Sequence, residues 1–144
     1  MKNIVSAFKL LVVLFLMMPA VQAQETKKLW MDELNIKAFS EGIPGILPKT
    51  NQGGDPMRMM GKTYSHGVGV ASTSILSFLL EGKATAFSAT VGVDDLGVKM
   101  LPHFFYVMGD GKILFESGEM KLGDQPKSFS VDLKGIQRMG MLVM

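Results

Sequence analysis

The sequence of 144 residues contains no cysteine. This absence excludes disulfide bonds, cysteine nucleophiles and thiolate metal sites. The chain also lacks a Ser-His-Asp arrangement in a recognisable order, a P-loop, an HExxH zinc motif and a dinucleotide-binding fingerprint. Asp94 and Asp95 resemble a pair of catalytic carboxylates, but neighbours at a strand end point apart, whereas a glycosidase needs two carboxyl groups that face each other across a cleft. An enzyme that acts by itself is therefore the least favoured function.

An excess of charge of either sign is also missing. The chain has 15 Lys and Arg against 13 Asp and Glu, and two of the basic residues, Lys2 and Lys9, lie within residues 1–23. Without that segment the charges balance at 13 of each sign, since 15 less 2 is 13. A general electrostatic attraction to nucleic acid or to an anionic membrane is not supported, so we expect neither as a partner of the mature chain.

The N-terminal segment has the three parts of a secretory signal. Lys2 and Lys9 precede an apolar run at residues 10–18, and Val-Gln-Ala at 21–23 forms a cleavage site. The run is shorter than the roughly 20 residues that cross a bilayer. We expect residues 1–23 to be a cleaved signal peptide, residues 24–28 to form a polar tether, and the mature protein to be secreted or periplasmic. A retained N-terminal anchor is the alternative.

Helical periodicity is missing from the rest of the chain, which instead alternates with a period of two. In residues 85–93, for example, Phe87 and Val91 share one face while Ser88 and Thr90 share the other. Turn residues separate such runs at short intervals. We expect an all-β fold, an antiparallel β-sandwich, with strands that include residues 75–80, 85–93, 128–133 and 138–144.

Residues 40–60 hold three prolines and four glycines. This density of breakers excludes regular structure from most of the segment. Loops of this length in compact domains are usually functional or disordered, and we expect a long loop here.

Residues 105–118 are expected to form a β-hairpin. Asp110 and Gly111 can supply the positive φ angles of a type I′ turn, and apolar runs lie on both sides of them. A two-residue turn at this point predicts that Val107 lies opposite Leu114. In the same register, Tyr106 lies opposite Phe115.

Three segments in a fixed order and spacing carry a family resemblance. They are Tyr-Ser-His-Gly-Val-Gly-Val at 64–70, Ala-Thr-Val-Gly-Val-Asp-Asp at 89–95, and the hairpin at 105–118 with its Gly-Asp-Gly-Lys turn. Together they resemble the NPCBM family, carbohydrate-binding modules that accompany glycoside hydrolases. The resemblance covers residues 29–143. It implies a jelly-roll sandwich of the galactose-binding-like kind, with an opening strand and a following loop within residues 29–39.

The chain departs from the family pattern at two places. Ala71 stands where many relatives have a histidine, and the family's closing segment, with a strand like Trp-Ala-Asp-Ala, does not follow Met144. We therefore expect residues 29–144 to be a C-terminally truncated NPCBM-like domain. A missing strand leaves backbone groups unpaired, so the domain is expected to be marginally stable or to associate through an exposed edge.

Polar candidates for ligand contact are His66 and the pair Asp94 and Asp95. The imidazole of His66 can donate and accept hydrogen bonds to sugar hydroxyls, or it can fix its own loop by bonding the backbone. The two aspartates can accept from hydroxyls or help to bind calcium. An Asx-type turn, in which they cap backbone N–H groups, is the favoured alternative.

Aromatic and basic candidates complete the predicted site. Trp30 and Tyr64 can offer a surface for the apolar face of a sugar, although most aromatic residues are simply core. Lys99 lies in the loop after the aspartate pair and can reach the same crevice, whereas a solvated lysine is the more common case. No metal other than a structural calcium ion is expected.

The resemblance implies a secreted, non-catalytic module that recognises galactose-containing glycans. Such a module tethers a glycoside hydrolase catalytic domain to its substrate, which raises the local substrate concentration. Two alternatives remain. One is a structural or protein-interaction domain that has lost sugar binding, a reading that Ala71 favours, and the other is an N-terminal fragment of an α-galactosidase-like hydrolase.

Overall fold

The computed structural model describes residues 27–36, 40–41 and 46–144. The predicted signal peptide, residues 1–23, lies outside the described residues, as do residues 24–26 of the predicted tether. None of the helices within the described residues is long and apolar enough to cross a membrane. Strands dominate the described part, and all of their pairings are antiparallel, so the predicted all-β class is confirmed.

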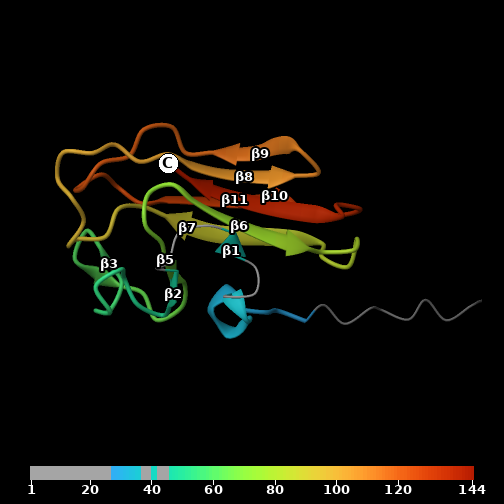
Figure 1. Cartoon of the computed structure of the whole chain (residues 1–144), viewed down its shortest axis with the longest axis horizontal. Coiled ribbons are helices and arrows are strands. Elements are labelled where there is room, and N and C mark those ends of the chain that lie inside the picture. Colours follow the sequence, from blue (N-terminus) through green and yellow to red (C-terminus); the bar gives the residue numbers. More distant parts are fainter. Residues whose placement is uncertain (1–26, 37–39, 42–45) are drawn as a thin grey trace, which may run out of the picture.

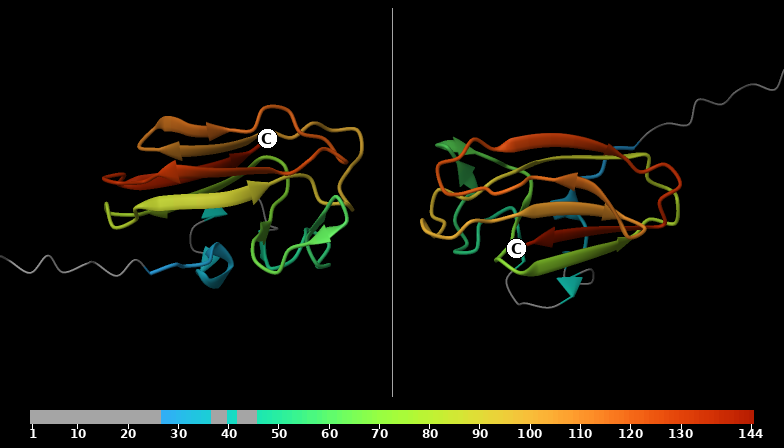
Figure 2. Two further views of the ribbon diagram at one scale, coloured as in Figure 1. Left: turned by 180° about the vertical axis from the view of Figure 1, so that it is seen from behind. Right: turned by 90° about the horizontal axis from the view of Figure 1, so that it is seen from above.

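Two sheets form the layers of the sandwich (Figures 1 and 2). The larger sheet has five strands in the order β1-β6-β11-β8-β9, and the smaller one pairs β10 with β7. The strands of these sheets are β1 (Ser40–Glu41), β6 (Ser74–Leu79), β7 (Ala86–Val91), β8 (Phe105–Gly109), β9 (Lys112–Glu116), β10 (Lys127–Asp132) and β11 (Arg138–Val143). Two short ladders pair β2 (Leu47–Pro48) with β5 (Val68–Gly69), and β3 (Arg58–Met59) with β4 (Lys62–Thr63).

One hydrophobic core lies between the two sheets. In β6, the buried side chains of Leu76 and Phe78 alternate with the exposed Ile75 and Leu79, as the pleat of a strand requires. In the smaller sheet, the predicted inward residues are half-buried while the serines and threonines between them are exposed. The inward side chains that pack against the core from this sheet are Phe87, Phe129 and Val131. The predicted faces of these strands are therefore confirmed.

The hairpin between β8 and β9 has the predicted turn but a different register. Asp110 and Gly111 have φ angles of 47° and 80°, as a type I′ turn needs. A β-bulge at Val107 and Met108 then shifts the pairing, so Val107 lies opposite Phe115 and Tyr106 opposite Glu116. The predicted pairs of Val107 with Leu114 and Tyr106 with Phe115 are wrong.

Packing explains the bulge. Leu114 is the extra residue, and both it and Phe115 pack against the core, which strict alternation along a strand does not allow for neighbours. Leu114 lies so close over Gly109 that a Cβ atom on that glycine would be 2.7 Å from its Cδ1 atom. Phe115 stacks on Phe129 at a centroid distance of 3.9 Å and so joins the two sheets.

The start of the domain also differs from the prediction. Residues 27–36 contain no strand, and instead include the 3-10 turn η1 (Met31–Glu33), whose Asp32 is buried. The carboxylate of Asp32 binds groups 34 and 35 residues later in the sequence, and the turn directs it inward. The first strand is β1, which pairs with β6 at Leu76 and Ile75. The predicted opening strand is therefore wrong for residues 29–36, and residues 37–39 lie outside the described part.

The predicted long loop is confirmed for most of its described length. Within residues 40–41 and 46–60, the only regular elements are β1, β2 and β3, each two residues long. Residues 46–69 lie with η1 on one side of the two sheets (Figures 1 and 2).

Candidate functional site

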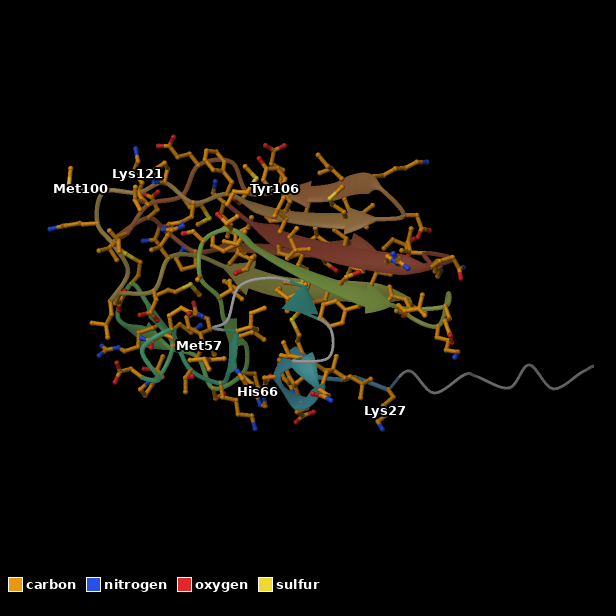
Figure 3. The ribbon with its side chains drawn as sticks, in the orientation of Figure 1. Lys27, Met57, His66, Met100, Tyr106 and Lys121 are labelled. Carbon is orange, nitrogen blue, oxygen red and sulfur yellow. The ribbon has the colours of Figure 1, made fainter. Side chains whose placement is uncertain are left out.

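Residues 46–69, together with η1, form a compact layer that carries most of the predicted site. Figure 3 shows Met57 and His66 in this layer, below the sheets in that view. Close backbone contact holds it together at Gly69, where a Cβ atom would lie 2.2 Å from the carbonyl oxygen of Thr50. Only glycine allows this approach, which aligns β5 beside β2 and fixes the turn that carries His66.

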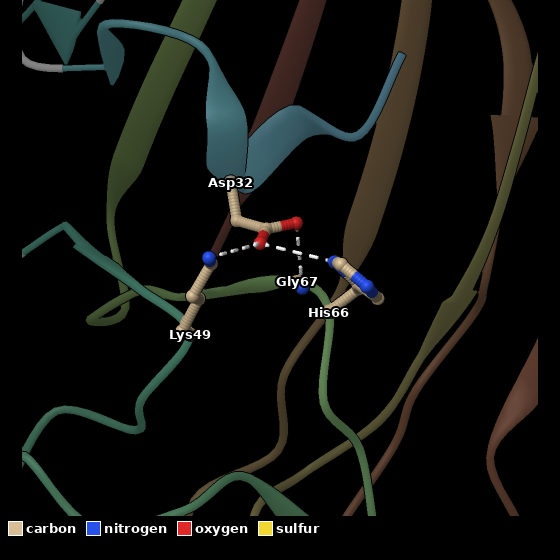
Figure 4. A network of polar contacts seen from close by, with 4 residues as sticks. All are labelled: Asp32, Lys49, His66 and Gly67. Atoms are coloured by element: carbon tan, nitrogen blue, oxygen red, sulfur yellow. Dashed lines mark hydrogen bonds and ion pairs between the residues drawn. The ribbon is translucent and has the colours of Figure 1, made fainter. Parts of the chain in front are cut away.

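Asp32 is the centre of a polar network in this layer (Figure 4). Its side chain is fully buried, at 0% exposure. Oδ1 accepts a hydrogen bond from the backbone N–H of Gly67 at 3.2 Å, and Oδ2 lies 3.2 Å from Nδ1 of His66. The ammonium group of Lys49 is 3.9 Å from Oδ2. These groups compensate the loss of water around a buried carboxylate.

Trp30 and His66 stack on one another at the surface. Their ring centroids are 4.1 Å apart and the ring planes differ by 8°. The ammonium group of Lys28 lies 3.9 Å from the centroid of the Trp30 ring. Since His66 covers one face of the indole, Lys28 occupies the other. Trp30 is 39% exposed and the His66 side chain 34%, so solvent reaches both rings.

We name these five residues the Trp30–His66 cluster: Lys28, Trp30, Asp32, Lys49 and His66. The sequence singled out two of them, Trp30 and His66, and the structure brings these together. It missed Asp32, Lys28 and Lys49. The signal for Asp32 was an acidic residue inside an apolar segment that fits no period, and no local pattern marks the two lysines as its neighbours.

Asp94 lies in a second polar network, which holds the same layer to the sandwich. Its Oδ1 accepts from Nδ2 of Asn51 and from the backbone N–H of Leu96, both at 3.0 Å. Its Oδ2 accepts from the backbone N–H of Arg58 at 2.8 Å. The bond to Leu96, two residues on, is the Asx-type turn that the sequence favoured. The bonds to Asn51 and Arg58 are long-range contacts that no local pattern predicts.

Asp95 continues this network. Its Oδ2 accepts from the backbone N–H of Gly61 at 2.9 Å, while its own N–H donates to the carbonyl oxygen of Arg58 at 2.8 Å. Gly61 has a φ of 76°, so the turn between β3 and β4 closes on the aspartate. Together, Asp94 and Asp95 fix the start of β3 and the turn that joins β3 to β4. Sugar contact by either aspartate stays a prediction.

The remaining candidates lie apart from the Trp30–His66 cluster or contact other groups. The half-buried ring of Tyr64 has the ammonium group of Lys62 at 5.1 Å from its centroid. Lys99 is exposed, and its neighbour Met100 lies far from His66 in Figure 3. Lys99 therefore lies apart from the Trp30–His66 cluster, and its contact with a ligand beside Asp94 and Asp95 stays a prediction.

Comparison with known proteins decides the family. Residues 27–144 match the family model described as the NPCBM/NEW2 domain. The chain belongs to this family. The three sequence segments predicted this family for residues 29–143, and the match over residues 27–144 confirms the prediction.

One relative is named an endo-alpha-N-acetylgalactosaminidase, from Renibacterium salmoninarum. It is 31% identical over 90 residues, which make up 62% of this chain and 6% of the relative. The chain therefore spans only a small part of that protein. The activity in the name of the relative refers to its full length, most of which has no counterpart in this match.

Solved structures with the same fold are CBM51 carbohydrate-binding modules. The CBM51 of a Clostridium perfringens GH95 protein, in complex with methyl-galactose, superposes with a TM-score of 0.69 at 25% identity, over 80% of this chain and 85% of that one. The CBM51-2 and INT domains of C. perfringens ZmpB, in complex with GlcNAc, give a TM-score of 0.73 at 23% identity, over 81% and 27%. The predicted β-sandwich is confirmed by these neighbours.

The described part of the NPCBM/NEW2 domain contains no preformed group of ligands for the predicted calcium ion. No three His, Cys, Asp or Glu residues there are close enough to share a metal ion. Both oxygens of Asp94, and one of Asp95, face N–H donors, which compete with a cation for the same lone pairs. The two aspartates therefore do not fit a calcium site in this arrangement, and a calcium requirement stays a prediction.

Proposed function

We propose that this NPCBM/NEW2 domain binds galactose-containing glycans at the Trp30–His66 cluster. The observation that carries the proposal is the stacked and solvent-accessible pair of Trp30 and His66, in a domain of a carbohydrate-binding family. An indole can contact the apolar part of a pyranose, and an imidazole nitrogen beside it can bind the hydroxyls of that sugar. The complex of a structural neighbour with methyl-galactose supports this choice of sugar.

The arrangement of the cluster defines how a sugar approaches. His66 covers one face of the indole of Trp30, so that face is closed to a ligand. The other face is covered by the ammonium group of Lys28. Lysine has four rotatable side-chain bonds and moves at small cost. Both faces of the indole are thus covered, so a sugar binds at the open edge of the stacked pair, where it contacts Trp30 and a ring nitrogen of His66 while Lys28 moves aside.

The proposed role of the domain is binding without catalysis. Hydrolysis of a glycoside needs two carboxyl groups that face each other about 5 to 10 Å apart across a cleft. The carboxylate of Asp32 is buried and bound by its neighbours, and those of Asp94 and Asp95 hold the backbone. We propose that the domain is exported and keeps a catalytic domain on the same polypeptide close to glycan substrate. Structural neighbours that include a CBM51 pair beside an M60 catalytic domain support this role.

Calorimetric titration with methyl galactoside and with GlcNAc tests the proposal. We expect dissociation constants for the galactoside near the millimolar range, about 4 kcal/mol, because an exposed site offers few hydrogen bonds. Trp30→Ala and His66→Ala are expected to abolish measurable binding. Lys134→Ala, on the exposed turn after β10, is the matched control. Unchanged binding in both site variants overturns the site assignment, and repeating the titration with calcium or a chelator tests the calcium prediction.

The alternative of a protein-interaction domain is favoured by one observation. In the loop between β7 and β8, the side chains of Leu96, Val98, Met100 and Leu101 are between 54% and 88% exposed. Exposed apolar groups on one loop often mark an interaction site. If the purified domain binds no glycan on an array, and Met100→Ser with Leu101→Ser abolishes self-association in light scattering, this second function replaces the first.

A further inference from the structure

The environment of Asp32 determines which atom of His66 carries a proton. Oδ1 of Asp32 accepts from the N–H of Gly67, and Oδ2 lies 3.9 Å from the ammonium group of Lys49. The N–H group and the ammonium group both donate, so each needs an acceptor oxygen on the carboxyl group. An anionic carboxylate can only accept hydrogen bonds. The contact of 3.2 Å between Oδ2 and Nδ1 of His66 therefore requires a proton on Nδ1.

A neutral imidazole has only one N–H group, so a proton on Nδ1 leaves a lone pair on Nε2. Nε2 lies at the far side of the ring from Asp32 (Figure 4). No hydrogen bond to Nε2 is formed within the described residues, and no buried side-chain nitrogen or oxygen there lacks a partner. Nε2 is thus open to solvent.

We propose that Asp32 holds His66 in the Nδ1–H tautomer, so that Nε2 accepts a hydrogen bond from a hydroxyl group of the bound sugar. The hydroxyl part of this inference rests on the proposed function, whereas the tautomer does not. Asp32 acts here as a positioning residue, since its fully buried side chain cannot touch a ligand itself.

The other residues of the cluster offer a ligand no accessible acceptor, so Nε2 of His66 determines which sugar substituents can bind there. Lys28 and Lys49 carry ammonium groups and Trp30 an indole N–H, and all of these groups only donate. Asp32 can accept but is inaccessible. Nε2 of His66 is consequently the one accessible side-chain acceptor within the cluster. A sugar hydroxyl that contacts Nε2 must donate a hydrogen bond to it. A substituent that cannot donate is rejected at this position.

Nuclear magnetic resonance of the histidine rings tests the tautomer without any ligand. The sequence has only two histidines, and His103, whose Nδ1 lies 3.2 Å from Oγ of Ser72, is the internal control. In two-bond proton–nitrogen spectra at neutral pH, the Nδ1 and Nε2 shifts of His66 are expected to be those of an Nδ1–H imidazole. His103→Gln assigns the signals. An Nε2–H spectrum for His66 overturns the inference.

Asp32→Asn provides a second test, with the opposite tautomer expected. The N–H of Gly67 requires an oxygen at the Oδ1 position, so the amide nitrogen of the asparagine faces Nδ1 of His66 and donates to it. The proton of the ring then moves to Nε2. If Asp32→Asn folds and its His66 keeps the Nδ1–H shifts, the proposed role of Asp32 is wrong. If the variant does not fold, the wild-type spectrum alone decides.

Deoxy and deoxyfluoro derivatives of methyl galactoside test the hydroxyl donor. Neither hydrogen nor fluorine at the replaced position can donate the hydrogen bond to Nε2. When the replaced hydroxyl is the one that contacts Nε2, both derivatives are expected to bind about three- to tenfold more weakly, as for one lost hydrogen bond. The same loss is expected to vanish in Asp32→Asn. If every fluoro derivative binds as tightly as methyl galactoside itself, no sugar hydroxyl donates a hydrogen bond to Nε2, and this part of the inference is wrong. An Nδ1–H spectrum without any galactoside binding supports the role of Asp32 and refutes the proposed function instead.

Discussion

At the scale of single residues, Lys28 and Trp30 form a contact that competes with the proposed ligand. An ammonium group over an exposed indole contributes about 0.5–1 kcal/mol, and a sugar that approaches Trp30 must displace it. We predict that Lys28→Ala strengthens galactoside binding about two- to fivefold in calorimetric titration, because this energy no longer opposes binding. The exposed Lys27→Ala is the control for general charge. Weaker binding in Lys28→Ala would show that Lys28 contacts the ligand.

Asp110 is a residue whose charge contributes to stability. Its carboxylate accepts from the backbone N–H groups of Arg138 and Gln137, at 2.9 Å and 3.1–3.2 Å. These hydrogen bonds lower the pKa of Asp110 from its usual value. A carboxyl group with a lowered folded-state pKa stabilises the protein above its unfolded-state pKa, and the contribution disappears as the pH falls through the folded-state pKa.

We therefore predict that Asp110→Asn lowers the urea midpoint at neutral pH and that the difference from the wild type shrinks as the solution is acidified. Asparagine tolerates the positive φ of 47°, so the change removes the charge but keeps the turn. Glu116→Gln, an exposed neutral substitution in the same hairpin, is the control. A difference in midpoint that is independent of pH would mean that the charge of Asp110 does not matter.

At the scale of elements, local patterns predicted the strands, whereas distant contacts decided what the patterns missed. Alternation in β6, β7, β10 and β11 fixes which side chains face inward, because it depends only on the pleat. The bulge in β8–β9 depends on the packing of Leu114 and Phe115 against other strands. Likewise, residue types suggested Trp30 and His66, but their contact joins positions 36 residues apart through Asp32.

The bulge makes Gly109 a position without room for a side chain. A Cβ atom there would lie 2.7 Å from Leu114 and 3.2 Å from Ile136. We predict that Gly109→Ala costs about 1–3 kcal/mol of unfolding free energy, as overpacking does. Gly140→Ala in the adjacent β11 is the matched control, because its Cβ would meet only Met108, at 3.9 Å. Equal urea midpoints for the two variants would show that the hairpin relaxes around the added methyl group.

At the scale of the whole molecule, the sandwich and the layer of residues 46–69 are joined by a few polar side chains. Asp94 connects the end of the β7 segment to Asn51 and Arg58, and the Trp30–His66 cluster depends on the same layer through Gly69 and Gly67. The position of the proposed site thus depends on hydrogen bonds of Asp94 that lie outside the site. Loss of Asp94 should act on galactoside binding through the order of the layer and not through ligand contact.

We predict that Asp94→Ala speeds amide hydrogen exchange across residues 51–61 and lowers the unfolding free energy by about 1–3 kcal/mol, since the buried amide of Asn51 loses its acceptor. Asp132→Ala is the matched control: Asp132 accepts from the backbone N–H of Lys134 in the same type of turn, at 2.9 Å, without the long-range bonds. Galactoside affinity is expected to fall less in Asp94→Ala than in His66→Ala, because of these two residues only His66 belongs to the proposed site. If Asp94→Ala abolishes binding while exchange in residues 51–61 stays at the wild-type rate, Asp94 contacts the sugar directly and the proposed site extends to the aspartate pair.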